Sequence, residues 1–219
     1  LNASLSLNKT VPNDKAYTDY VDWVSKGLEE PLTTHADRFK FNQGYGTSSY
    51  DKGSIFLSQL GYIIGEENLY KTMQLYFKRW AFKHPRPYDF IRCAERVSGL
   101  ELDWYLMDWT QTTKQIDYQI NSIIGEGSKT KIVLKREKQM PMPIDVLVRL
   151  KNGTSQLYNI PLTMMRGSRP LEGAKLLESW DWAQPYYVFE INVSKENLLE
   201  VVIDPLGFTA DVNRKNNSL

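Results

Sequence analysis

The chain has 219 residues, of which 42% are hydrophobic and 24% charged, and this is enough to bury one large core or two modest ones. Its 27 basic and 26 acidic residues leave a net charge of +1, so no broad field of one sign attracts nucleic acid or an anionic membrane. A single cysteine, Cys93, excludes an intrachain disulfide. No apolar run approaches the roughly 18 residues of a transmembrane helix. Neither nucleic acid nor a membrane is expected as a partner.

The first half of the chain has helical periodicity. Five predicted helices share an apolar side chain every three or four positions: residues 14–24, 49–64, 66–80, 90–97 and 103–109. Gly65 and Gly99 follow the second and fourth of them, where a glycine commonly ends a helix. Short connections between these helices predict that residues 1–115 form a compact helical subdomain.

Beyond Ile116 the apolar residues recur at every second position. Four segments alternate in this way: residues 144–150, 158–162, 187–193 and 199–203. Turn residues separate them, most clearly Asn152-Gly153. The sequence therefore predicts an α+β chain with an antiparallel β-sandwich over residues 116–212, followed by a frayed tail over residues 213–219.

Two tyrosines stand where an irregular loop is expected to enter the buried helix. Tyr45 and Tyr50 are five residues apart, and the residues between them are glycine, threonine and serine. A phenol is a neutral hydrogen-bond donor at pH 7, and it suits the oxyanion that develops when a carbonyl is attacked. Two tyrosines in a loop are more often structural, and the residues alone leave both interpretations open.

Two other kinds of function remain open from the residues. Ser49 and Lys52 fit the pattern S-x-x-K, in which a serine one turn before a lysine acts as a nucleophile, although the K-T-G partner of that pattern is absent. Labelling of Ser49 by an acylating probe would identify such a serine-lysine acyl hydrolase. A non-catalytic β-sandwich interaction module is the other alternative.

The chain contains only two histidines, His35 and His84, and neither begins the zinc motif H-E-x-x-H. His35 and Asp37 form a His-x-Asp pair, but two ligands without a third fall short of a zinc site. Both histidines are predicted to be surface or loop residues.

Three segments carry a resemblance to a known family. The first is Tyr50-Asp51-Lys52-Gly53 with the apolar helix behind it, and the second runs from Phe82-Lys83-His84-Pro85 to Asp117-Tyr118. The third joins Met140-Pro141-Met142-Pro143-Ile144, the stretch from Trp180 to Tyr187, and Ile203-Asp204-Pro205. Together they resemble the zinc-dependent aminopeptidases of the aminopeptidase N and leukotriene-hydrolase type, the gluzincins. The resemblance covers about residues 15–213.

The resemblance implies that the chain is the C-terminal portion of a zinc metallo-aminopeptidase, comprising the helical end of its catalytic domain and the following β-sandwich. In such enzymes H-E-x-x-H and a further glutamate hold the zinc, and these ligands precede the Y-x-K-G segment. Tyr50 matches the tyrosine that helps the zinc stabilise the oxyanion, and Tyr45 matches a second tyrosine lining the same pocket. Lys52 and Gly53 match the motif and are assigned packing roles.

The same resemblance implies partners and a cofactor. The parent enzyme would use zinc and act on peptides with a free N-terminus, in contact with N-terminal and catalytic regions of the same polypeptide that this chain lacks. The chain alone is expected to bind no catalytic zinc and to be inactive.

Overall fold

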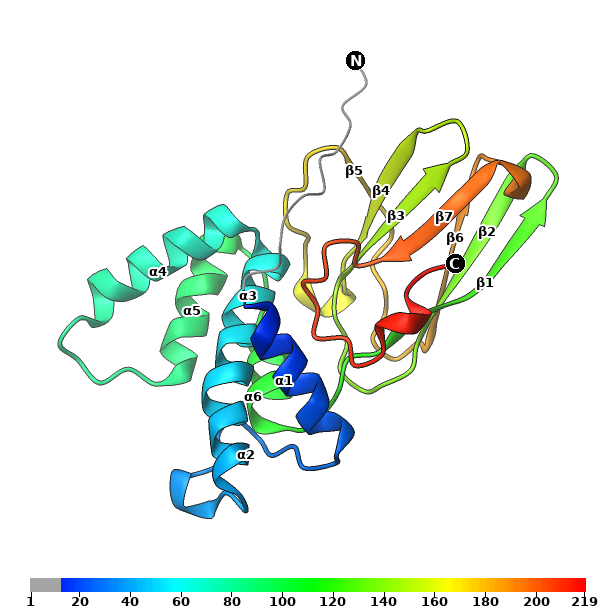
Figure 1. The fold of residues 1–219 in the computed structure, drawn as a ribbon. Coiled ribbons are helices and arrows are strands. Elements are labelled where there is room, and N and C mark those ends of the chain that lie inside the picture. Colours follow the sequence, from blue (N-terminus) through cyan, green and yellow to red (C-terminus); the bar gives the residue numbers. More distant parts are fainter. Residues whose placement is uncertain (1–12) are drawn as a thin grey trace.

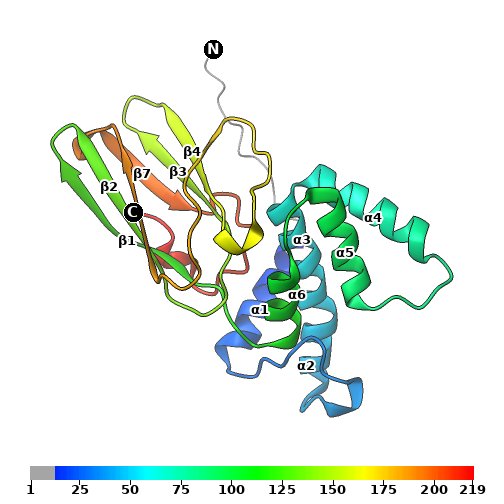
Figure 2. The same cartoon turned by 180° about the vertical axis from the view of Figure 1, so that it is seen from behind.

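The computed structural model describes residues 13–219. Helices fill the first half of this range and strands the second, so the predicted α+β class is confirmed (Figure 1). The α-helices are α1 (Asp14–Ser25), α2 (Asn42–Gly46), α3 (Lys52–Ile64), α4 (Glu66–Trp80), α5 (Pro87–Ser98) and α6 (Asp103–Gln111). Seen from both sides, α1 and α3 lie next to the strands, while α4 and α5 lie on the far side of α3 (Figures 1 and 2).

The strands form two sheets. They are β1 (Tyr118–Glu126), β2 (Lys129–Arg136), β3 (Ile144–Leu150), β4 (Ser155–Ile160), β5 (Ala174–Leu176), β6 (Tyr186–Ile191) and β7 (Leu198–Ile203). One sheet has the order β1-β2-β6 and the other the order β5-β4-β3-β7. Every pair is antiparallel except β4 with β5, which is parallel because a long connection returns β5 to the edge in the direction of β4.

Helix α3 is the centre of the helical half. Its side chains Ile55, Leu60 and Ile63 are fully buried, as their helical spacing predicts. The helix ends at Gly65, whose φ of 91° lies in a region that favours glycine, and the chain turns there directly into α4. The end of the predicted helix at Gly65 is therefore confirmed.

Hydrogen bonds join the helices to the sandwich. The Tyr17 hydroxyl of α1 donates to the Phe208 carbonyl at 2.8 Å, and the Gln59 side chain of α3 accepts from the Ala210 amide at 2.7 Å. The buried apolar side chains of both halves belong to one contiguous core. Because this core is continuous, the division of the chain into domains at residue 116 stays a prediction.

Residues 213–219 are not the frayed tail that the sequence predicts. The Ile203 amide donates to the Asn217 carbonyl at 2.7 Å, and Val201 and Leu219 exchange backbone hydrogen bonds at 2.8 and 3.1 Å. Strand β7 is at the edge of its sheet, where its free backbone groups need a cover. The C-terminal residues provide that cover.

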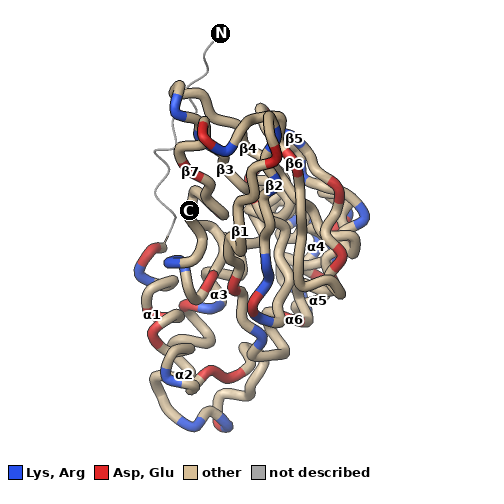
Figure 3. The backbone as a smooth tube through the Cα atoms, turned by 90° about the vertical axis from the view of Figure 1, so that its right-hand side faces the viewer, with Lys and Arg blue, Asp and Glu red and all other residues tan. Residues whose placement is uncertain are grey.

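Charges of both signs are interspersed along the two halves in the view of Figure 3, as the balanced composition predicts. Within residues 13–219, no helix combines the length and the apolar character needed to cross a bilayer.

Candidate active site

The segment that carries the two tyrosines is helical, so the expectation of an irregular loop is wrong. Helix α2 leads without a break into a π-helical turn over Thr47–Asp51, and this turn leads into α3. Gly44 helps the segment to pack, because a Cβ at this position would lie 3.2 Å from Glu30 Oε2 and 3.3 Å from the Trp23 ring. Gly44 thus allows a close approach within a helix, whereas Gly46 has no neighbour within 4 Å of a Cβ position.

The π-turn decides how the two tyrosines face one another. In an unbroken α-helix five residues make about 1.4 turns, so Tyr45 and Tyr50 would point to different sides. Hydrogen bonds in a π-turn join residues five apart, which brings positions i and i+5 towards the same face. The rings of Tyr45 and Tyr50 accordingly lie edge to face, with centroids 6.3 Å apart and an interplanar angle of 90°.

Both phenols reach the surface. Tyr50 is 70% exposed and Tyr45 is 40% exposed, and neither hydroxyl has a hydrogen-bond partner within residues 13–219. Phe39 packs edge to face against the other side of Tyr45, with ring centroids 5.7 Å apart. Tyr50 thus presents a free donor to solvent on a face braced by two aromatic rings.

A buried ion pair is formed by Lys52, two residues after Tyr50. Lys52 Nζ is 2.7 Å from Glu29 Oε1, and the two side chains are only 1% and 6% exposed. Burial lowers the pKa of Lys52, and the Glu29 carboxylate opposes that effect. The Tyr20 hydroxyl donates to the same Glu29 oxygen at 3.3 Å, and burial raises the pKa of Tyr20 well above its ordinary value. The resemblance assigns Lys52 a packing role, and no sequence pattern identifies Glu29 as its partner.

The S-x-x-K alternative has no support in this geometry. The Lys52 ammonium donates to Glu29 and, at 3.2 Å, to the Thr112 carbonyl. No hydrogen bond joins Ser49 to Lys52 in the described part of the chain. An amine engaged in an ion pair is not available to accept the proton of a serine.

The described residues do not fit a zinc site. His35 and Asp37 lie close together, with 3.6 Å between Nδ1 and Oδ2, and both side chains are largely exposed. Across residues 13–219, no group of three or more His, Cys, Asp or Glu side chains is placed to hold a metal ion. A zinc site requires at least three protein ligands.

Comparison with known proteins shows what this region is similar to. Residues 7–109 match the sequence model of the Peptidase family M1 domain, a range that includes α2, the π-turn and all of α3. The helical half of the chain is thus similar to a Peptidase family M1 domain. The M1 match thus covers both tyrosines and the Lys52–Glu29 pair, and it ends within α6.

Curated aminopeptidases extend the similarity into the sandwich. Aminopeptidase N of Streptomyces lividans is 39% identical over 64 residues, which are 29% of this chain and 8% of that protein. Aminopeptidase N of Escherichia coli K12 is 26% identical over 140 residues, 60% of this chain and 16% of that protein. Leucyl aminopeptidase of Saccharolobus solfataricus is 24% identical over 202 residues, 88% of this chain and 23% of that protein. The chain therefore spans less than a quarter of the length of these relatives.

A solved structure agrees with the fold. Aminopeptidase A of Legionella pneumophila, crystallised with aspartic acid, superposes with a TM-score of 0.52 at 14% identity. The match covers 89% of this chain and 21% of that one. The arrangement of helices followed by a β-sandwich is therefore one that a known aminopeptidase contains.

Proposed function

We propose that this chain supplies the oxyanion-stabilising tyrosine of a zinc metallo-aminopeptidase that removes N-terminal residues from peptides. The observation that carries the proposal is the Tyr50 phenol, which is 70% exposed and has no hydrogen-bond partner in the described part of the chain. The M1 match over residues 7–109 and the aminopeptidase names of the relatives support the reaction class.

The chemistry assigned to Tyr50 is hydrogen-bond donation. When water attacks the scissile carbonyl of a peptide, negative charge develops on the carbonyl oxygen, and the Tyr50 O–H donates to that oxygen. A donor fixed in place stabilises the transition state more than the bound substrate, so its contribution falls on kcat. The proposal assigns Tyr45 to the same substrate pocket, and its edge-to-face contact with the Tyr50 ring supports that assignment.

The zinc of such an enzyme would be held by polypeptide outside this chain, because the described residues offer no ligand set for it. Peptides with a free N-terminus, and the remaining regions of the same polypeptide, are the partners that the proposal implies. The purified chain should then hold no stoichiometric zinc and should not cleave an aminoacyl anilide. Metal analysis and the anilide assay measure the two expectations separately.

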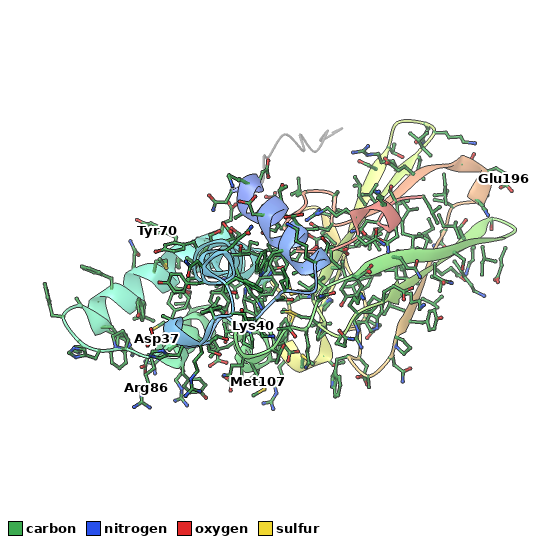
Figure 4. All side chains as sticks on the ribbon, turned by 60° about the horizontal axis from the view of Figure 1, so that its bottom comes forward. Asp37, Lys40, Tyr70, Arg86, Met107 and Glu196 are labelled. Atoms are coloured by element: carbon green, nitrogen blue, oxygen red, sulfur yellow. The ribbon has the colours of Figure 1, made fainter. Side chains whose placement is uncertain are left out.

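The substitution Tyr50→Phe in the full-length enzyme tests the assignment. It removes only the hydroxyl, and kcat should fall by about 10² to 10³, the usual effect of losing one oxyanion donor. The unfolding transition should not move, since the side chain is largely exposed. Tyr70→Phe is the matched control, because Tyr70 is 65% exposed on α4 and projects away from the loop that carries Asp37 and Lys40 (Figure 4). Near-normal turnover of Tyr50→Phe would reject the assignment.

A further inference from the structure

Lys52 closes the π-turn. Its backbone N–H donates to the carbonyl of Thr47, five residues earlier, which is the hydrogen bond that defines a π-turn. Its own carbonyl accepts from Trp109 Nε1 of α6 at 3.0 Å. The backbone of Lys52 is therefore fixed on both sides, one residue after the π-turn ends and two residues after Tyr50.

The Lys52 side chain joins this point to two other elements. Its ammonium lies 2.7 Å from Glu29, 3.2 Å from the Thr112 carbonyl and 5.2 Å from the centroid of the Trp109 ring. Glu29 in turn accepts from the Tyr20 hydroxyl of α1. The end of α6, the chain after α1 and the π-turn thus meet at one buried ion pair.

Stability alone does not account for a charged pair in this place. Removing a lysine and a glutamate from water costs several kcal/mol for each ion, and well-packed apolar residues in place of such a pair are often neutral or stabilising. The pair is also incompletely satisfied, because Glu29 Oε2 is buried without a hydrogen-bond partner among residues 13–219. An ion pair differs from apolar packing because it fixes the relative positions of its two charged groups.

That geometry matters for Tyr50. Each residue of an α-helix turns the chain by about 100°, so relaxation of the π-turn to a regular α-helix would rotate Tyr50 away from Tyr45 by roughly that angle. A misplacement of about 1 Å at a catalytic group can lower the rate about 10²-fold. The element that holds the π-turn therefore controls where the Tyr50 hydroxyl points.

We propose that Lys52 and Glu29 are positioning residues, whose buried ion pair holds the π-turn so that the Tyr50 hydroxyl faces the reacting carbonyl. The proposal rests on the proposed function of Tyr50 and extends it to residues that touch neither substrate nor the reacting atoms. It assigns the lysine of the Y-x-K-G segment a role beyond packing.

A double-mutant cycle in the full-length enzyme tests the proposal. Lys52→Met keeps the length and apolar contact of the stem but removes the charge, and kcat should fall by about 10- to 100-fold with KM within about threefold of wild type. If Lys52 acts through Tyr50, the variant Lys52→Met/Tyr50→Phe should turn over within about threefold of Tyr50→Phe alone. If the two substitutions act independently, the fold losses in kcat of the single variants multiply in the double variant. That result would overturn the proposal.

Two further variants separate positioning from folding. Lys52→Met leaves the Glu29 carboxylate buried and unpaired, so Lys52→Met/Glu29→Gln removes both charges and is carried through the same cycle. Lys114→Met is the matched control, because Lys114 pairs with Asp108 at 2.7 Å with its side chain 42% exposed, and its kcat should stay within about twofold of wild type.

Full turnover of the neutral pair Lys52→Met/Glu29→Gln would also overturn the proposal. If Tyr50→Phe lowers turnover but the effects of Lys52→Met and Tyr50→Phe multiply in the double variant, only the positioning role is rejected. If Tyr50→Phe has normal turnover, the proposed function itself is rejected.

Discussion

The rings of Tyr45 and Tyr50 meet edge to face at 6.3 Å because a π-turn, rather than an α-turn, separates them. Aromatic pairs in this arrangement contribute about 0.5 to 1.5 kcal/mol beyond the area they bury. At an exposed site, that contact limits the directions in which the Tyr50 ring can swing. The pair is therefore a means of holding a solvent-facing donor still.

Substitution of Tyr45 should separate the ring from its hydroxyl. Tyr45→Phe keeps the contacts with Tyr50 and Phe39, so kcat/KM should stay within about threefold of wild type if only the ring supports Tyr50. Tyr45→Ala removes those contacts, and kcat/KM should fall by about 2- to 10-fold, the rate equivalent of one aromatic pair. Steady-state kinetics of the full-length enzyme measure both variants. An equal loss in Tyr45→Phe and Tyr45→Ala would instead assign the effect to the hydroxyl.

Arg169 should be needed for the stability of the joint between helices and sandwich. Its guanidinium pairs with the buried Asp145 of β3 and donates to the Tyr62 carbonyl of α3. Arg169 Cζ also lies 4.2 Å from the centroid of the Tyr62 ring. Burial raises the pKa of Asp145 and the Arg169 charge opposes this, so Arg169→Met should lower the unfolding free energy by about 3 to 5 kcal/mol.

Arg149→Met is the control for that variant. Arg149 pairs with Glu200 at 2.9 Å on the surface, where the loss should be at most about 1 kcal/mol. Urea denaturation of the 219-residue chain compares the two variants. If Arg169→Met lowers the unfolding free energy by no more than Arg149→Met does, the contacts of Arg169 do not hold the helices and the sandwich together.

Asp211 should make stability depend on pH. Burial raises its pKa to about 6, although the amides of Tyr118 and Asn213 donate to it. The folded chain therefore binds this proton more tightly than the unfolded chain, where an aspartate titrates near 3.9. The contribution of Asp211 to the unfolding free energy is then most favourable below about pH 4, and it falls by up to about 3 kcal/mol as the pH rises through 6.

Denaturation of the chain and of Asp211→Asn at several pH values isolates this contribution, because asparagine does not titrate in that range. The difference in unfolding free energy, wild type minus variant, should decrease between about pH 4 and pH 7. A difference that is constant or increases with pH would contradict the raised pKa.

The sequence predicts the elements well where period and boundary residues agree. The predicted helix over residues 66–80 coincides with α4, and the helix expected before Gly99 ends as α5 at Ser98. The four predicted strands correspond to β3, β4, β6 and β7, with ends shifted by at most three residues. In β6 and β7 buried side chains alternate with more exposed ones, so burial there has the same period that the sequence displays. Strand β3 buries its first five residues on both faces, and α4 buries only Thr72, so in these two segments the sequence period locates the element but not its buried side chains.

The geometry of the site is less accessible from the sequence. A π-turn has no sequence pattern of its own, and the glycines at positions 44 and 46 are more typical of loops than of helices. The Lys52–Glu29 contact joins residues 23 apart in the chain, and no local period predicts it. One signal was present, because a lysine next to a strongly apolar helix indicates a charge that requires a buried partner.

The most direct measurement compares the affinity of the full-length enzyme for a phosphinic peptide that mimics the tetrahedral intermediate with its affinity for a ground-state peptide. Tyr50→Phe should weaken binding of the phosphinic peptide by about 10²- to 10³-fold and binding of the ground-state peptide by no more than about threefold. Equal changes in the two affinities, or no change in either, would mean that the Tyr50 hydroxyl does not stabilise the oxyanion.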